Sequence, residues 1–259
     1  MTDELVHLDI VGGVATITLD SPANRNALSR RLVSDLRGHL DTALADARAR
    51  VIVLTGTGTV FCSGADLKEQ RTANESSETT LKNAGLPGIL LDMWNSPKPV
   101  LGRINGHARA GGLGLIGACD LVVAVEDATF GFSEVRIGVA PAIISVVLLP
   151  KIGITRGMEL FLTGETFDAR ASVAMGMVNA AVPALDLDAA VNRYVDSLLK
   201  GGPIALGACK RLVREVPGRP LEEAFAWAAD FSASLFASEE GREGMTAFAE
   251  KRPPRWQQP

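Results

Sequence analysis

The sequence predicts an α/β protein that ends in a helical region. Apolar runs that suit buried strands recur near Val51, Val100, Leu121 and Met177, each as part of a strand-then-helix unit. Beyond Pro183 the composition becomes helical throughout, in segments bounded by Gly, Pro or Ser. With 259 residues, of which 47% are apolar, the chain can bury an ample core in one large domain or two unequal ones.

The composition argues against several classes of function. A net charge of −4 gives the chain no overall attraction for nucleic acid. Three cysteines without metal-site spacing fit a reducing compartment, and we expect Cys62, Cys119 and Cys209 to be small buried residues. The N-terminus lacks a secretory signal, and the longest apolar run, 137–150, is too short to span a bilayer. We therefore expect a cytoplasmic protein that is not inserted in a membrane.

The first part of the chain predicts a hairpin, a loop and a helix. Residues 5–19 alternate apolar and polar around Gly12-Gly13, which is typical of two antiparallel strands joined by a tight turn. The segment 21–28 is rich in turn formers and precedes the helix. Leucines at every fourth position predict that helix: Leu32, Leu36, Leu40 and Leu44.

The next part predicts a strand, a polar stretch and a second helix. Residues 51–54 suit a buried strand and lead into a glycine-containing turn at 55–67. The stretch 69–83 is the most polar of the chain, and it is either a mobile flap or an ordinary surface linker. Residues 86–94 read as a helix that stops at the prolines of Ser96-Pro97-Lys98-Pro99.

Residues 104–134 contain the features that suggest chemistry. A predicted strand at 99–104 gives way to a cluster of small residues that ends at Gly111 and Gly112, where a ligand can approach the backbone closely. A short buried helix is predicted from about Gly112, so unpaired N–H groups near Gly111 would lie at its positive end. Such groups can stabilise developing negative charge.

A carboxylate follows this cluster. The predicted strand 121–125 and a turn lead to Phe130-Gly131-Phe132-Ser133-Glu134, which places Glu134 among apolar neighbours. Burial of that kind raises the pKa of a carboxyl group. Glu134 is therefore a candidate for proton transfer.

The glycines also match a dinucleotide-binding pattern, but weakly. Residues 112–117 fit G-x-G-x-x-G and open a predicted helix after a strand. That motif needs its strand directly before the first glycine and an acid about twenty residues on. Here six residues separate strand and glycine, and the acids come too early. An NAD-dependent dehydrogenase is thus the weaker interpretation.

Four segments together resemble the crotonase family, the enoyl-CoA hydratases and isomerases. They are 26–28, the turn 55–67, Asn105-Gly106 with the glycine cluster, and 130–135 ahead of Gly138 and Pro141. The resemblance extends from about Leu5 to Arg252. It implies a spiral core of ββα units with an acyl-CoA site over residues 1–200. It also implies a C-terminal helical region, 201–259, that forms trimers or dimers of trimers.

The resemblance assigns roles to individual residues. It implies that the N–H groups of Ala65 and Gly111 form an oxyanion hole for a thioester carbonyl and that Glu134 is the acid/base. It implies no metal and no cofactor other than the coenzyme A of the substrate. The residues expected to contact the substrate or its CoA are Arg25, Ala27, Ser63, Ala65, Asp66, Leu67, Lys68, Gly111 and Lys251. Lys251, and also Phe248 three residues before it, match positions that often reach the CoA of an adjacent subunit in this family.

One departure from the family pattern bears on the reaction. Hydratases of this family usually carry a second glutamate at the position of Gly114, which cannot titrate. Glu134 would then perform both proton transfers of a hydration, or it would shuttle a proton between C2 and C4 as an isomerase. The stretch 134–145 is similar to hydratases of branched, carboxylated substrates such as methylglutaconyl-CoA. In that case Arg109 and Arg136 are candidates to bind a distal carboxylate.

The sequence therefore predicts an enoyl-CoA hydratase that adds water across the 2,3 double bond. The alternatives are an enoyl-CoA isomerase and a non-catalytic acyl-CoA binder, and the family also includes thioester hydrolases and decarboxylases. Other residues lack a suitable pattern. His7, His39 and His107 are too scattered for a metal site, and Ser133 lacks the final glycine of a nucleophile elbow.

Overall fold

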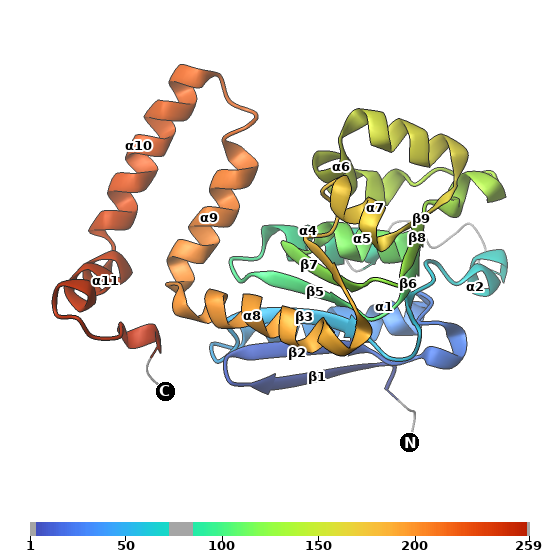
Figure 1. Cartoon of the computed structure of the whole chain (residues 1–259), viewed down its shortest axis with the longest axis horizontal. Helices are drawn as coiled ribbons and strands as arrows, with labels where there is room; N and C mark the ends of the chain where they lie inside the picture. The colour runs from blue at the N-terminus through green and yellow to red at the C-terminus, as the bar shows by residue number, and fades with distance from the viewer. Residues whose placement is uncertain (1–3, 73–84, 258–259) are drawn as a thin grey trace.

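A six-stranded sheet forms the base of the molecule (Figure 1). The structure is a computed structural model that describes residues 4–72 and 85–257. The strand order is β1-β2-β3-β5-β7-β10, with β1 and β2 antiparallel and the other neighbours parallel. The strands are β1 (Val6–Val11), β2 (Val14–Leu19), β3 (Val51–Gly56), β5 (Val100–Ile104), β7 (Leu121–Val125) and β10 (Ala180–Val182). The predicted hairpin and the predicted strands at 51, 100 and 121 are confirmed, whereas the last strand begins three residues after Met177.

The predicted leucine helix is α1 (Arg30–Ala45). It begins at Ser29, whose side-chain oxygen accepts a hydrogen bond from the N–H of Leu32 at 3.2 Å and satisfies one of the first free donors. Leu32, Leu36 and Leu40 are buried against the sheet, because a spacing of four keeps them on one helix face. Helix α1 thereby packs on the hairpin strands β1 and β2.

A second, smaller sheet has the order β4-β6-β8-β9. Strands β4 (Val60–Cys62), β6 (His107–Arg109) and β8 (Thr129–Gly131) are parallel, and β9 (Thr166–Asp168) is antiparallel to β8. Each strand has only three residues. Because β4, β6 and β8 are parallel and adjacent, their carboxyl ends lie at the same edge of the sheet, and the segments that follow them are neighbours in space.

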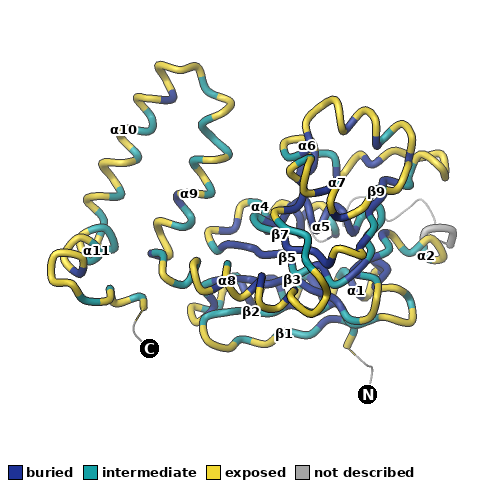
Figure 2. Tube along the Cα trace, in the orientation of Figure 1, coloured by how far each residue is buried: buried dark blue, intermediate teal, exposed yellow. Residues whose placement is uncertain are grey.

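Helices lie between and around these two sheets. They are α2 (Leu67–Thr72), α4 (Leu86–Asn95), α5 (Gly111–Ala118), α6 (Ala142–Thr163) and α7 (Ala169–Ala174). Helix α6 is broken at Gly153, whose φ of 73° is left-handed. The buried residues of α4, α5 and the first half of α6 form one core with the strands (Figure 2). Of the polar stretch predicted at 69–83, residues 69–72 end α2, and 73–83 lie outside the described residues.

The C-terminal helices divide into one that covers the sheet and three that extend away from it. Helix α8 (Leu187–Lys200) packs on β3, β5 and β7. Helices α9 (Pro203–Glu215), α10 (Leu221–Ala237) and α11 (Glu239–Ala249) form an arm that projects from the body (Figure 1). The arm, residues 201–257, is mostly exposed (Figure 2). Its exposed apolar side chains include Leu221, Phe225, Phe236 and Phe248.

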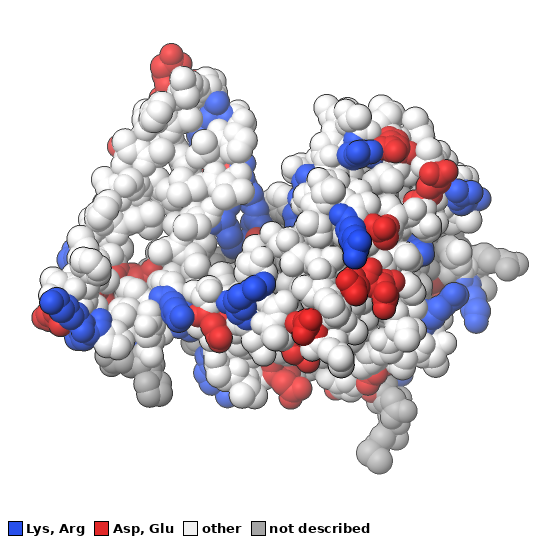
Figure 3. Space-filling view, viewed as in Figure 1, with Lys and Arg blue, Asp and Glu red and all other residues white. Residues whose placement is uncertain are grey.

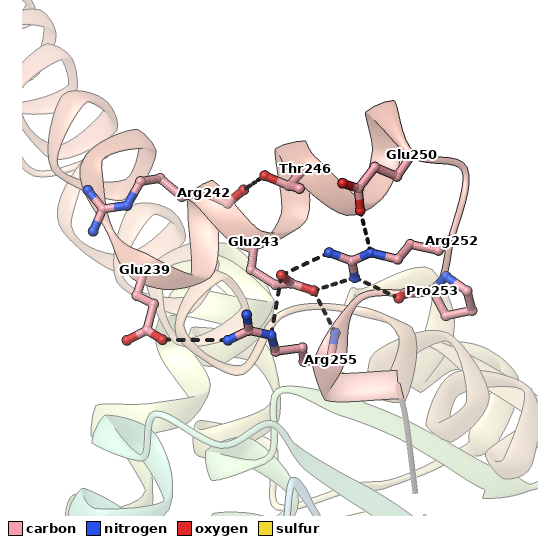
Figure 4. A network of polar contacts seen from close by, with 8 residues as sticks. All are labelled: Glu239, Arg242, Glu243, Thr246, Glu250, Arg252, Pro253 and Arg255. Carbon is pink, nitrogen blue, oxygen red and sulfur yellow. Dashed lines mark hydrogen bonds and ion pairs between the residues drawn. The ribbon is translucent and has the colours of Figure 1, made fainter.

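Ion pairs and hydrogen bonds attach the arm to the body. The carboxylate of Asp120 accepts from Lys210 Nζ and from Arg214 Nη2, each at 2.7 Å. Basic side chains gather where the arm meets the body (Figure 3). At the other end of the arm, Glu243 accepts from Arg252 at 2.7 Å and holds the last residues against α11 (Figure 4). Arg50, directly before β3, donates to the carbonyl of Trp256 at 2.6 Å and ties this end of the arm to the large sheet.

None of the described helices combines the length and the apolar composition that crossing a bilayer requires.

Candidate active site

Three turns meet at the common edge of the smaller sheet. The turn with Ala65 follows β4, the turn with Gly111 follows β6, and the turn with Glu134 follows β8. The three strands are adjacent and parallel, so all three turns lie at their carboxyl ends. In parallel sheets this is the edge where ligands bind. The fold thus brings together the three residues that the sequence predicts to be catalytic.

The first two turns are in direct contact. Gly64 has a φ of +88°, and a Cβ placed on it would lie 2.8 Å from the Cβ of Ala110 and 3.3 Å from the backbone nitrogen of Gly111. Only glycine allows this approach, since it has no Cβ. The contact fixes how far the backbone of Ala65 lies from that of Gly111.

Two backbone donors remain available at this contact. Within the described residues, the N–H groups of Ala65 and Gly111 donate to no protein acceptor. Gly111 is the first residue of α5, where N–H groups lack a partner within the helix and carry partial positive charge. Ala110 before it has φ 47° and ψ −119°, a backbone conformation that residues other than glycine rarely adopt. This unusual conformation marks the site as constrained.

The loop 25–28 supports the first turn. The N–H of Leu28 donates to the carbonyl of Gly64 at 2.8 Å, and the N–H of Ser63 donates to the carbonyl of Arg25 at 3.1 Å. Asn26 anchors this loop, because its buried side chain donates to the carbonyls of Thr57 and Val60 and accepts from Ser21. The sequence pattern did not reveal this role of Asn26. The sequence feature that could have indicated this role is a loop rich in turn formers that contains an asparagine, whose amide can bond to backbone groups.

Glu134 lies on a 3-10 helix, η3 (Ser133–Ile137), and not on a strand. The N–H of Ala110 donates to the carbonyl of Gly131 at 3.2 Å, which links the turn that bears Glu134 to the turn that bears Gly111. Burial raises the pKa of the Glu134 carboxyl. Its Oε2 is buried and has no hydrogen-bond partner among the described residues. A carboxyl group in this condition is suited to accept and return a proton.

An apolar wall lies beside the donors. A Cβ on Gly111 would lie 2.8 Å from Leu28 Cδ1 and 3.4 Å from Leu86 Cδ2. One helical turn later, a Cβ on Gly114 would lie 2.5 Å from Ile144 Cγ2. These side chains present an apolar surface on one side of Gly111, and a lower local dielectric there would strengthen the interaction of a developing charge with the donors.

The glycines of the G-x-G-x-x-G pattern have packing roles in this structure. A Cβ on Gly112 would lie 2.6 Å from the carbonyl oxygen of Cys62, and one on Gly117 would lie 2.9 Å from Leu148 Cγ. Together with Gly114 they allow α5 to approach β4 and α6 closely. Cys62 and Cys119 are buried as predicted, and burial raises the pKa of both thiols to about 12. Cys209 is exposed, so the prediction that it is buried was wrong.

Most residues predicted to contact CoA lie on one part of the surface. Arg25 and Ala27 run beside Ser63 and Ala65 through the hydrogen bonds described above, and Leu67 and Lys68 follow in α2. Arg25, Leu67 and Lys68 are exposed, whereas Ala27 is buried.

Asp66 has a structural role at the start of α2. Its carboxylate accepts from Asn24 Nδ2 and from the N–H of Lys68, each at 2.9 Å. The hydrogen bond from Asn24 lowers the pKa of Asp66. These bonds hold the turn that carries Ala65.

Lys251 is not part of this surface within one chain. It follows α11, which lies at the opposite end of the molecule from α2 (Figure 1). Its predicted contact with the CoA of an adjacent subunit stays a prediction.

The two arginines proposed for a distal carboxylate are bonded to backbone carbonyls. Arg109 donates to the carbonyls of Ala108 and Thr129, at 2.8 and 2.5 Å. Arg136 donates to the carbonyl of Gly164 at 3.1 Å. Both guanidinium groups therefore hold the strands and helices around Glu134. Within the described residues, no group of three His, Cys, Asp or Glu side chains could hold a metal ion.

Comparison with known proteins decides the family. The family profile described as enoyl-CoA hydratase/isomerase matches residues 9–259. The chain belongs to the enoyl-CoA hydratase/isomerase family. The predicted membership of the crotonase superfamily is confirmed, and so is the prediction that the chain is an enzyme of this family.

Individual members of the family cover almost the whole chain. A Thermus thermophilus protein provisionally named an enoyl-CoA hydratase is 37% identical over 95% of this chain and 98% of its own. An Escherichia coli carnitinyl-CoA dehydratase is 32% identical over 98% of both chains. The crystal structure of an enoyl-CoA hydratase from Shewanella pealeana has a TM-score of 0.92 at 30% identity and covers 97% of this chain and 96% of its own. These similarities confirm the predicted α/β crotonase-like fold with its C-terminal helices.

Proposed function

We propose that this family member is an enoyl-CoA hydratase in which Ala65 and Gly111 bind the thioester oxygen and Glu134 moves the proton. The observation that carries the proposal is the meeting of three turns at one sheet edge: two have N–H donors that bond to no acceptor in the described part of the chain, and one has a buried carboxyl group. Each group suits one part of hydration chemistry. The carbon–oxygen bond forms at C3, the proton is added at C2, and the charge in between resides on the thioester oxygen.

The two N–H groups lower the barrier by stabilising that charge. When water attacks C3, the electrons of the C2=C3 bond move toward the thioester, and its oxygen becomes an enolate oxygen. Two fixed donors are complementary to this oxygen and need no reorganisation when the charge develops. The N-terminal end of α5 adds its partial positive charge at the same point.

Glu134 performs both proton transfers of the hydration. Its carboxylate accepts a proton from the attacking water, and the resulting hydroxyl bonds to C3. The same carboxyl group then donates that proton to C2, which restores the thioester carbonyl and the carboxylate. One acid suffices for both transfers because water and proton add to the same face. The raised pKa of Glu134 favours the first transfer, because a carboxylate of higher pKa is a stronger base toward the attacking water.

The rival within the family is an isomerase that uses the same three groups. There Glu134 would remove a proton from C2 and return it at C4, through the same enolate. This alternative stays open because position 114, where hydratases of the family usually carry a second glutamate, is Gly114. Both reactions require no cofactor beyond the coenzyme A that the substrate itself carries.

We further propose that residues 201–259 assemble three chains, as a trimer or a dimer of trimers. The arm exposes large apolar side chains such as Leu221 at 69%, Phe225 at 70% and Phe248 at 87%. Exposed apolar groups on this scale mark an interaction surface. In such an assembly Lys251 would reach the CoA of a neighbour.

A spectroscopic assay tests the proposed reaction. The conjugated thioester of a 2-enoyl-CoA absorbs in the ultraviolet, and hydration removes that absorbance. We expect its loss with short and branched 2-enoyl-CoAs, including methylglutaconyl-CoA. Appearance of the absorbance from a 3-enoyl-CoA, without loss from any 2-enoyl-CoA, would favour the isomerase. Binding of acyl-CoA with neither change would favour a non-catalytic binder.

A further inference from the structure

Helix α5 carries two small positions on the face that borders the donors. Gly111 and Gly114 are three residues apart, so their Cα atoms are neighbours on one helix face. Helix α4 runs along this face: Leu86 lies against Gly111, and Leu90, one turn later in α4, lies against Gly114. A side chain at position 114 would therefore enter the same apolar wall that borders Gly111.

That space is already filled. A Cβ on Gly114 would lie 2.5 Å from Ile144 Cγ2, 3.2 Å from Ile144 Cβ and 3.2 Å from Leu90 Cδ1. Real Cβ atoms almost never approach closer than 3.0 Å. Ile144 and Leu90 are each only 3% exposed, so neither side chain can swing into solvent to make room.

We propose that Ile144 prevents a second catalytic acid at position 114, because its side chain fills the space that such a residue would need. Its side chain occupies the position that a Cβ at residue 114 would take, and it places an apolar surface there. Within the described part of the chain, Glu134 then acts without a second carboxyl group at position 114, because packing excludes a side chain there. The catalytic part of this inference rests on the proposed function, whereas the packing part does not.

The packing part can be measured without substrate. We expect Gly114→Ala to lower the melting temperature by about 2–10 °C, the range for an overpacked core in a domain of this size. Ile144→Ala should also lower it, because it leaves a cavity. In the double variant the melting temperature should fall by less than the sum of the two single decreases, because the smaller side chain at position 144 makes room for the Cβ at position 114. A Gly114→Ala variant as stable as the wild type would overturn the proposal.

The catalytic part needs a carboxyl group at position 114 and a neutral control. Gly114→Glu and Gly114→Gln, each combined with Ile144→Ala, introduce side chains of nearly equal size. We expect the Glu variant to hydrate 2-enoyl-CoA about tenfold faster than the Gln variant, with an additional ionisation in its pH profile. Equal rates and equal pH profiles would show that position 114 does not face the reaction and would overturn the proposal.

A second control separates general packing from this role. Gly117 contacts Leu148 on the same helix pair, with a hypothetical Cβ at 2.9 Å from Leu148 Cγ. Gly117→Ala should lower the melting temperature like Gly114→Ala. Gly117→Glu with Leu148→Ala should add no ionisation to the pH profile. If the wild type hydrates no enoyl-CoA, the proposed function fails, but the coupling between positions 114 and 144 still decides the packing part.

Discussion

The N–H of Ala110 donates to the carbonyl of Gly131 at 3.2 Å. This bond joins the strand that leads to Gly111 with the strand that leads to Glu134. Gly111 is the next residue after Ala110, and Glu134 is three residues after Gly131. This hydrogen bond continues the pairing of β6 and β8 up to the residues beside the proposed oxyanion donor and the proposed acid.

Replacing Glu134 with glutamine should abolish most of the activity and stabilise the fold. Glutamine keeps the shape of the side chain but cannot transfer a proton, so we expect turnover to fall on the order of 10²-fold or more. The same change removes a buried carboxyl group whose Oε2 has no partner among the described residues. Steady-state kinetics and calorimetry on one preparation measure both effects. A Glu134→Gln variant with full turnover would refute the assignment.

The pH dependence of stability should follow the raised pKa of Glu134. Burial raises that pKa above the ordinary value of 4.5. The folded state therefore favours the protonated form. The stability that this form provides, measured as the free energy of unfolding, is fully present below about pH 4 and is lost as the pH rises through the raised pKa. We expect the melting temperature of Glu134→Gln relative to the wild type to increase between about pH 4 and pH 7. A difference that stays constant over this range would place the carboxyl group in solvent.

Gly64→Ala should inactivate the enzyme by separating the two donor turns. Its Cβ would meet the Cβ of Ala110 at 2.8 Å, so the turn with Gly111 must move. The positive φ of Gly64 adds backbone strain of its own. Gly12→Ala is the control for that strain, because Gly12 has a φ of +59° and nothing lies within 4 Å of a Cβ there. Both variants should lose about 1 kcal/mol or more of stability, but only Gly64→Ala should lose turnover. Equal turnover in the two variants would argue against the contact.

The sequence predicted the fold class, the donor turn at Gly111 and the carboxylate Glu134 from local signals, whereas Ala65 was assigned by the resemblance to the crotonase family. A strand, a turn of small residues and a helix start are read from consecutive residues, and Gly111 follows directly from them. Contacts between distant residues have no such signal. Gly114 and Ile144 are thirty residues apart, and the buried position of Ile144 depends on how α6 packs on α5. The pattern therefore showed that Gly114 cannot titrate but not why a side chain is excluded.

Charged residues show the same limit. Arg109 and Arg136 were candidates for a distal carboxylate because the stretch 134–145 is similar to hydratases of branched, carboxylated substrates. In the structure both donate to backbone carbonyls on neighbouring elements. The number of unsatisfied carbonyls near an arginine is a property of the tertiary structure, so composition and spacing do not reveal it.

Asp120→Ala should loosen the arm without changing the site. The carboxylate of Asp120 accepts from Lys210 and Arg214, and the two cationic side chains are 9% and 19% exposed. Removing one partner of a partly buried pair leaves these charges uncompensated, at a cost of about 3 kcal/mol. We expect a lower melting temperature and faster hydrogen exchange in α9, with exchange in α5 unchanged. Arg156→Ala, which breaks an exposed pair with Glu159, is the control and should cost well under 1 kcal/mol. If both variants are equally stable, the ion pairs at Asp120 do not hold the arm.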